Sequence, residues 1–209
     1  GEGDCVNSYN IDYVKGNYNW DKNQSKYASK TPNKFADEKY GNCADINLFT
    51  VGLLNALGIP AKPVIISTRD NGKIKYDYPY THFFNYVIIL ASVEGESILT
   101  DATEILGLNN RIPSRCINDK GLIVQKDKVE WIGLECTFPS EIKTDLRIEI
   151  THDATICSGI SKYAWEYDAT DFRNSYTGKA ETIKKRLETT AYTLVDSSAS
   201  RVQHLLSNS

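Results

Sequence analysis

The sequence predicts an α+β fold in which a helix packs on an antiparallel sheet, and two patterns carry this prediction. Apolar residues recur at three- and four-residue steps from Ile46 to Leu57, and Gly58 followed by Pro60 ends this helix. Three segments with the composition of strands come next, at 61–68, 81–93 and 97–103. A helix followed by a meander is typical of an α+β fold rather than of repeated βαβ units.

Two turn sequences justify the antiparallel order of these strands. Asn71 and Gly72 lie at the tip of the sequence RDNGK, between the first strand and the second. The sequence EGE at 94–96 is a second tight turn, between the second strand and the third. Because tight turns join antiparallel neighbours, the three strands should lie side by side in chain order.

Shorter elements are expected before and after this region. Residues 7–20 predict a short helix or a helical turn that ends near Gly16, and Thr31 followed by Pro32 predicts the start of another short helix. The later elements are expected to be short strands at 121–125 and 129–134, a hairpin from about residue 145, and a helix at 178–195. We therefore expect a core at 1–140 and a smaller β-rich segment with one helix at 141–209.

Composition excludes several classes of protein. The 209 residues carry a net charge of −3, so no excess of positive charge indicates a nucleic acid or an anionic lipid as partner. The longest apolar run, Val87 to Ala91, is far shorter than the ~20 residues of a membrane span. With five cysteines, three histidines and no C-x-x-C motif, we expect no metal and no cofactor. The chain begins Gly-Glu-Gly and has no methionine, so we expect it to be a piece of a longer polypeptide.

Cys43 is the candidate nucleophile because it stands at the start of the predicted helix. Unsatisfied backbone N–H groups and the positive end of the helix dipole both favour a thiolate there. The backbone N–H of Cys43 would also point to the place where an oxyanion develops. The alternative is a buried cysteine that fills a small space in the core.

His82 and Asp101 could complete a catalytic group. They fall on the second and third predicted strands, which the EGE turn makes neighbours, so their side chains can lie side by side. A cysteine activated by an imidazole that a carboxylate orients is the general arrangement for covalent acyl transfer. The alternatives are a half-exposed strand histidine and an aspartate that forms a turn with Thr103.

Three separated segments together resemble one known family. GNCADINLFTVGLLNALGIPAKPV, THFFNYVII and LTDATE are similar to the motifs of the transglutaminase-like superfamily, relatives of papain-type cysteine enzymes. The resemblance covers roughly residues 10–115 and implies a transglutaminase-like, cysteine-proteinase core with the nucleophile helix packed on the sheet. It implies Cys43 as nucleophile, His82 as general base and acid, and Asp101 as the residue that orients the imidazole.

The resemblance also suggests supporting residues and a context. Trp20 is a candidate second oxyanion donor through its indole N–H, with a core tryptophan as the alternative. Asp45 is expected to accept hydrogen bonds near the helix start, and Asn85 to hold the strand at the site. NYNWDKNQSKYASKTPNKF and RIPSRCINDKGLIV resemble a subgroup of large secreted bacterial proteins with flanking β-rich domains of unknown function. This implies flanking domains of a larger polypeptide and a periplasmic or extracellular location.

Two functions follow as hypotheses. The first is cysteine-dependent acyl transfer on an amide, protein or peptide substrate, by hydrolysis or by transfer to another amine. The second is a non-catalytic binding or scaffolding module in a larger cell-envelope protein. A sulfur and an imidazole within hydrogen-bond reach in an open groove would favour the enzyme. A site sealed under the flanking chain would favour the scaffold, or an enzyme awaiting removal of a neighbouring segment.

Overall fold

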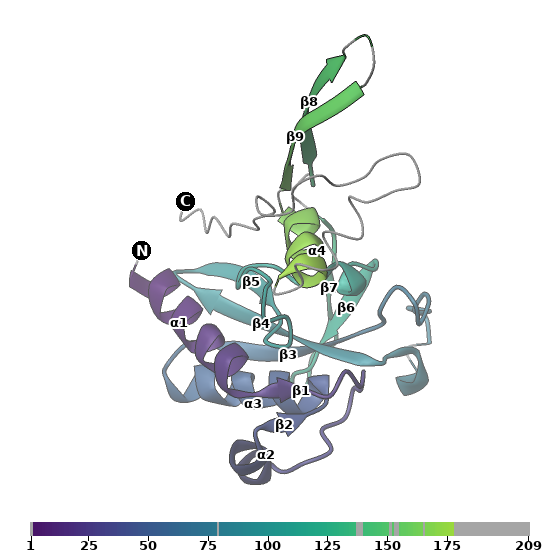
Figure 1. Ribbon diagram of the computed structural model, residues 1–209. Helices are drawn as coiled ribbons and strands as arrows, with labels where there is room; N and C mark the ends of the chain where they lie inside the picture. Colours follow the sequence, from purple (N-terminus) through teal and green to yellow (C-terminus); the bar gives the residue numbers. More distant parts are fainter. Residues whose placement is uncertain are drawn as a thin grey trace. The chain divides into compact units, whose positions relative to one another are not determined.

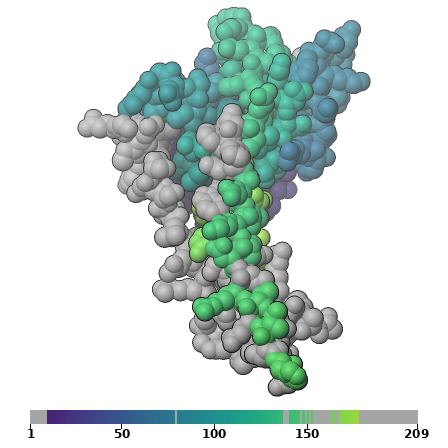
Figure 2. All heavy atoms as spheres, turned by 90° about the horizontal axis from the view of Figure 1, so that it is seen from above, coloured from purple at the N-terminus to yellow at the C-terminus, as the bar shows by residue number. Residues whose placement is uncertain are grey.

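The computed structural model describes most of the chain, namely residues 2–78, 80–136, 140–150, 152, 155–164 and 166–177. It divides the chain into two compact units, Gly1–Thr137 and Phe138–Ser209. In a space-filling view the blue-to-teal residues of the first unit pack into one continuous mass (Figure 2).

The first unit contains helices and strands in mixed order. Its α-helices are α1 (Glu2–Asn17), α2 (Pro32–Glu38) and α3 (Cys43–Ala56), and its short 3₁₀ helices are η1 (Thr81–Phe83) and η2 (Ser114–Cys116). Its strands are β1 (Asn19–Trp20), β2 (Tyr40–Gly41), β3 (Ala61–Ile66), β4 (Tyr86–Val93), β5 (Glu96–Thr100), β6 (Lys120–Ile123) and β7 (Glu130–Gly133).

A five-stranded sheet with the order β5-β4-β3-β6-β7 forms the centre of this unit, and all of its neighbours are antiparallel. Helix α3 packs on β3 and β4, α1 contacts α3 and β4, and α2 contacts α3 (Figure 1). Strands β1 and β2 form a separate parallel pair. The predicted α+β fold, with a helix packed on an antiparallel sheet, is confirmed.

Helix α3 begins and ends where the sequence predicts. The Asn42 side chain accepts from the Asp45 N–H at 2.9 Å and the Asp45 carboxylate accepts from the Asn42 N–H at 2.9 Å, which is a capping box. At the other end Gly58 adopts a φ of 81°, a left-handed conformation that suits glycine. Between these ends Ile46 and Leu54 are buried in the core against α1 and the sheet.

The strand predicted at 81–93 is wrong in its first part. Residues Thr81–Phe83 form η1, closed by a hydrogen bond from the Phe84 N–H to the Thr81 carbonyl at 3.2 Å, and β4 starts only at Tyr86. The turn at 94–96 is confirmed, with positive φ at Glu94 and Gly95. The connection between β3 and β4 is longer than the tight turn that the sequence predicts, because it also contains η1.

The second unit contains β8 (Ile142–Ile150) and β9 (Thr155–Ala164), an antiparallel hairpin that confirms the prediction from residue 145 onward. The helix α4 (Glu166–Tyr176) was not predicted from the sequence. The helix predicted at 178–195 lies outside the described residues. Within the described ranges, the helices are all too short or too polar to cross a membrane.

Candidate active site

Cys43 is the first residue of α3, and its side chain is completely buried. A loop that runs from Asp21 to Lys30 crosses the start of this helix. The backbone N–H of Ser25 donates to the Cys43 sulfur at 3.1 Å, and the thiol donates to the Ser25 carbonyl at 3.1 Å. The backbone of one residue therefore contacts the sulfur with both its donor and its acceptor.

Burial raises the pKa of the Cys43 thiol to about 12. The backbone N–H groups of Ser25 and Val87 and the charge of Arg115 lower this pKa, and the charge of Asp101 raises it, but desolvation is the largest effect. The sequence predicts that the helix start would favour a thiolate. In the folded chain the loss of water outweighs the helix start, so the thiol is neutral near pH 7.

The two expected oxyanion donors converge on a single oxygen atom. The Cys43 backbone N–H donates to the Asn23 carbonyl at 3.2 Å, and the Trp20 indole Nε1–H donates to the same oxygen at 3.0 Å. An oxyanion hole needs this geometry, with two N–H groups aimed at one point beside the nucleophile. Here the oxygen at that point belongs to the chain itself.

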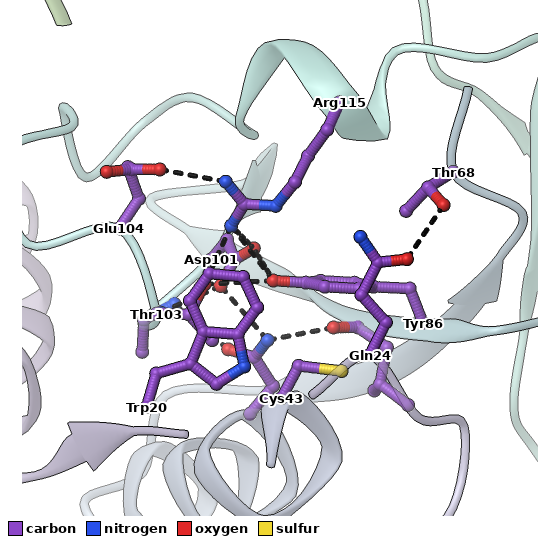
Figure 3. Close-up of polar contacts among 12 residues, drawn as sticks. Trp20, Gln24, Cys43, Thr68, Tyr86, Asp101, Thr103, Glu104 and Arg115 are labelled. Carbon is purple, nitrogen blue, oxygen red and sulfur yellow. Dashed lines mark hydrogen bonds and ion pairs between the residues drawn. The ribbon is translucent and has the colours of Figure 1, made fainter. Parts of the chain in front are cut away.

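Asp101 follows β5 directly, and only 1% of it is exposed. Its carboxylate accepts hydrogen bonds from the Tyr86 hydroxyl at 2.8 Å, the Asn47 Nδ2 at 3.1 Å and the Thr103 N–H at 2.8 Å. The guanidinium of Arg115 lies 3.6 Å away and points toward Asp101 and Tyr86 (Figure 3). The carboxylate is therefore held on several sides. The hydrogen bond from the Thr103 N–H forms the turn with Thr103 that was the alternative role for Asp101.

Tyr86, not a histidine, occupies the place beside this carboxylate. Its hydroxyl contacts the Thr103 hydroxyl at 2.9 Å and accepts from Arg115 at 3.0 Å, besides donating to Asp101. Burial raises the pKa of the Tyr86 phenol well above its usual value, and the charge of Asp101 adds to this effect. The phenol is therefore protonated, and its donor is already used by Asp101.

His82 lies elsewhere. It is exposed in η1, where its ring packs against Tyr80 at 5.6 Å and Phe83 at 4.2 Å between ring centroids. No hydrogen bond or ion pair of the described residues joins it to Cys43 or Asp101. The structure brings Cys43 and Asp101 to one site and leaves His82 before the start of β4, so the catalytic role of His82 stays a prediction from the resemblance.

Asp45 fastens the loop that crosses the site to the start of α3. Its carboxylate accepts from the Ser29 N–H and hydroxyl, both at 2.7 Å, and from the Lys30 N–H at 3.0 Å. Gly41 is required next to it, because a Cβ at that position would lie 2.7 Å from the Asp45 carboxylate oxygen. Asp45 therefore acts on the shape of the site and touches neither the sulfur nor Asp101.

Asn85 stands just before β4 and binds the same loop from the sheet. Its Nδ2 donates to the Gln24 Oε1 at 2.6 Å and to the Thr68 hydroxyl at 2.7 Å, and its Oδ1 accepts from the Thr68 N–H at 2.9 Å. Trp20 packs edge-on against Tyr86, with ring centroids 6.3 Å apart, and the Arg115 guanidinium lies 4.7 Å from the Trp20 ring centroid.

Sequence reasoning missed three residues of the site: Asn47, Tyr86 and Arg115. Asn47 is fully buried on α3, where its Nδ2 donates to the Val87 carbonyl at 2.8 Å and its Oδ1 accepts from the Ala102 N–H at 2.9 Å. A signal for Asn47 existed, since it stands one helical turn after Cys43 and therefore on the same face of the helix. We find no such signal for Arg115. In the described part of the chain, no three or more His, Cys, Asp or Glu side chains come together in a group that could hold a metal ion.

Comparison with known proteins finds a family model that matches part of the chain. Residues 7–96 match the family model of the transglutaminase-like superfamily. This part of the chain is therefore similar to the transglutaminase-like superfamily, and the similarity supports a cysteine-dependent catalytic role without establishing the reaction.

A solved structure of a proposed cysteine protease from Cytophaga hutchinsonii is 15% identical to the chain, with a TM-score of 0.37. It is matched over 77% of this chain and 44% of its own length, so the chain spans less than half of that protein. No curated protein matches the chain.

The buried thiol predicts a pH-dependent cost of the substitution Cys43→Ala. At pH 7 the variant should be less stable by about 1–2 kcal/mol, because it loses a buried sulfur and its hydrogen bonds. The folded-state pKa of about 12 lies above the ~8.5 of an unfolded thiol. The stability that the neutral thiol contributes is therefore complete below pH 8.5 and is lost as the pH rises toward 12.

The stability advantage of the native chain over the variant should fall by about 1.4 kcal/mol per pH unit between pH 9 and 11, so the variant becomes the more stable of the two within this range. Urea titrations at several pH values measure it. A difference that stays constant over this range would contradict the raised pKa.

Proposed function

We propose that the transglutaminase-like core of this chain is a non-catalytic binding or scaffolding module. The observation that carries the proposal is the residue beside Asp101, because Tyr86 fills the position where a general base would stand. Acyl transfer needs a thiolate, and a thiol with a pKa of about 12 is ionised in only about 10⁻⁵ of molecules at pH 7. With no imidazole in contact, nothing among the described residues takes the proton from Cys43.

The covering loop supports the same proposal. A nucleophile must meet the substrate carbonyl, but the Cys43 side chain is fully buried and Ser25 contacts its sulfur. The resemblance to large secreted bacterial proteins fits a module of this kind in a cell-envelope polypeptide, in the periplasm or outside the cell. In such a protein the core would contribute shape and contacts rather than turnover.

Alkylation rates test this proposal within one molecule. Iodoacetamide should label Cys43 at least ~100-fold more slowly than the exposed Cys136 at pH 7.5, because thiolate and access are both missing at Cys43. Mass spectrometry of the peptides that contain each cysteine measures both rates in the same sample. If Cys43 is labelled as fast as Cys136, the thiol is activated and the proposal is wrong.

A second candidate function is cysteine-dependent acyl transfer, by hydrolysis or by transfer to an amine. One specific observation favours it, namely that the Cys43 N–H and the Trp20 indole N–H aim at one oxygen beside the sulfur. The superfamily match adds to this support. Labelling with an electrophilic peptide library, compared between the native chain and Cys43→Ala, separates the two candidates, since only an acyl-transfer enzyme should show rapid labelling that depends on Cys43.

A further inference from the structure

Residues Asp21–Tyr27, which we call the plug, occupy the site. Their backbone makes the hydrogen bonds there that the backbone of a bound peptide would make. The Asn23 carbonyl takes both N–H donors of the oxyanion position, at 3.2 and 3.0 Å. Two residues later, the N–H and the carbonyl of Ser25 contact the Cys43 sulfur. The backbone of the plug thus supplies the acceptor for the Cys43 N–H and both a donor and an acceptor for the sulfur, while the Val87 N–H of β4 also acts on the sulfur.

One side chain of the plug, that of Gln24, is held by two polar side chains. The Gln24 Oε1 accepts from the Thr68 hydroxyl at 3.1 Å and from the Asn85 Nδ2 at 2.6 Å, next to the ends of β3 and β4. Figure 3 shows Gln24 directed toward Thr68, beside the Cys43 sulfur. The Asn42 side chain adds a donor to the Tyr27 carbonyl at 3.1 Å.

The plug is held by polar contacts and not by a core of its own. Every residue from Asp21 to Lys30 is half-buried or exposed, so the plug buries no apolar side chain completely. Lys22 adopts a φ of 68°, a conformation that costs energy for a residue with a Cβ. Segments with few buried apolar contacts open at lower free energy than the core around them. Cys43 and Cys116 both lie fully buried in the cluster that contains Tyr86, but the described hydrogen bonds join the plug to Cys43 and not to Cys116.

We propose that the plug is an intramolecular ligand that opens as a unit, and that the vacated site takes an extended polypeptide in its place. The carbonyl of such a peptide would replace that of Asn23, and its backbone would contact Cys43 as Ser25 does. The inference rests on the proposed function in one respect, namely that the site binds peptide without cleaving it. It adds that binding is controlled by a segment of this same chain.

Three cysteines of the chain make the opening measurable. Cys136 is exposed and reports free access, whereas Cys116 is buried in the core and reports global unfolding. The native chain is treated with a disulfide reagent at pH 8.5 in increasing sub-denaturing urea, and the rate at each cysteine is followed by mass spectrometry. Cys43 should react more slowly than Cys136, faster than Cys116, and with a weaker urea dependence than Cys116.

The substitution Gln24→Ala should raise the rate at Cys43 at least ~10-fold and leave Cys116 unchanged, because it removes the seated side chain without touching the core. The matched control is Gln125→Ala, the same chemical change at a glutamine that binds Lys62 and Glu130 instead. Equal rates and equal urea dependence at Cys43 and Cys116, or acceleration of both by Gln24→Ala, would overturn the proposal.

A synthetic peptide with the sequence WDKNQSKY identifies the ligand class. Added to the Gln24→Ala variant, it should slow the reaction at Cys43 and not at Cys136, whereas a scrambled peptide should not. Absence of protection at millimolar peptide would overturn the assignment of a polypeptide ligand. Cleavage of the peptide that depends on Cys43 would instead refute the non-catalytic function and leave the plug intact, so the two failures are distinguishable.

Discussion

The substitution Tyr86→His should activate Cys43. Asp101 would orient an imidazole at this position, since its carboxylate already accepts a hydrogen bond from the Tyr86 hydroxyl at 2.8 Å. An imidazole beside a cysteine lowers the pKa of the thiol by several units through a thiolate–imidazolium pair. We therefore expect the alkylation rate of Cys43 at pH 7.5 to rise by about 10³-fold when the plug is also weakened by Gln24→Ala.

The pH profile of alkylation measures this effect. In the Gln24→Ala background with Tyr86 present, the rate should rise tenfold per pH unit up to at least pH 10, as a thiol with a pKa of about 12 requires. With Tyr86→His the profile should level off near neutral pH. Tyr86→Phe is the matched control, since it removes the hydroxyl and supplies no base. If the histidine and phenylalanine variants react equally fast, Tyr86 does not occupy the position of the base.

The substitution Asp101→Ala should cost about 3 kcal/mol of the free energy of unfolding. It would leave the Tyr86 hydroxyl and the Asn47 amide without their buried acceptor, and Arg115 without one of its two carboxylates. In an enzyme the residue that orients the base is expected to affect rate more than stability. Here we expect the main effect on stability, because Asp101 joins α3, β4 and the end of β5.

Urea unfolding at pH 7, with the slope of the transition checked for each variant, measures the loss. Glu104→Ala is the control, because it removes the other carboxylate that pairs with Arg115, at 2.8 Å, from a more exposed position. It should cost about 1 kcal/mol. Equal losses for the two substitutions would show that the buried network around Asp101 is not what stabilises the core.

The local features near Cys43 were predictable because they depend on neighbours in sequence. The cap at Asn42, the helix up to Ala56 and the glycine at 58 follow from short-range rules. The helix start of α2, with Thr31 as cap and Pro32 as first residue, is confirmed for the same reason. Asp101 was found because the turn at 94–96 fixes the pairing of β4 with β5.

His82 was wrongly predicted to lie on a strand, because the residues around it have the composition of one. The composition of 81–93 is typical of a strand throughout, and the sequence alone does not say where pairing begins. Pairing with β3 starts at Tyr86, opposite Ile66, and the residues before it turn back into η1. Tyr86, whose hydroxyl donates to Asp101, therefore stands four positions after His82, the histidine of the motif.

The sequence by itself determined an α+β fold, a similarity to the transglutaminase-like superfamily and a cysteine at a helix start, because each depends on local pattern or on motif order. Only the tertiary structure decided whether that cysteine is reactive. The pKa of a thiol depends on water and on charges that arrive from distant segments, and here burial raises this pKa, Ser25 of the plug contacts the sulfur, and Tyr86 donates to Asp101. Neither the approach of the plug nor the register of β4 is encoded in the residues next to Cys43.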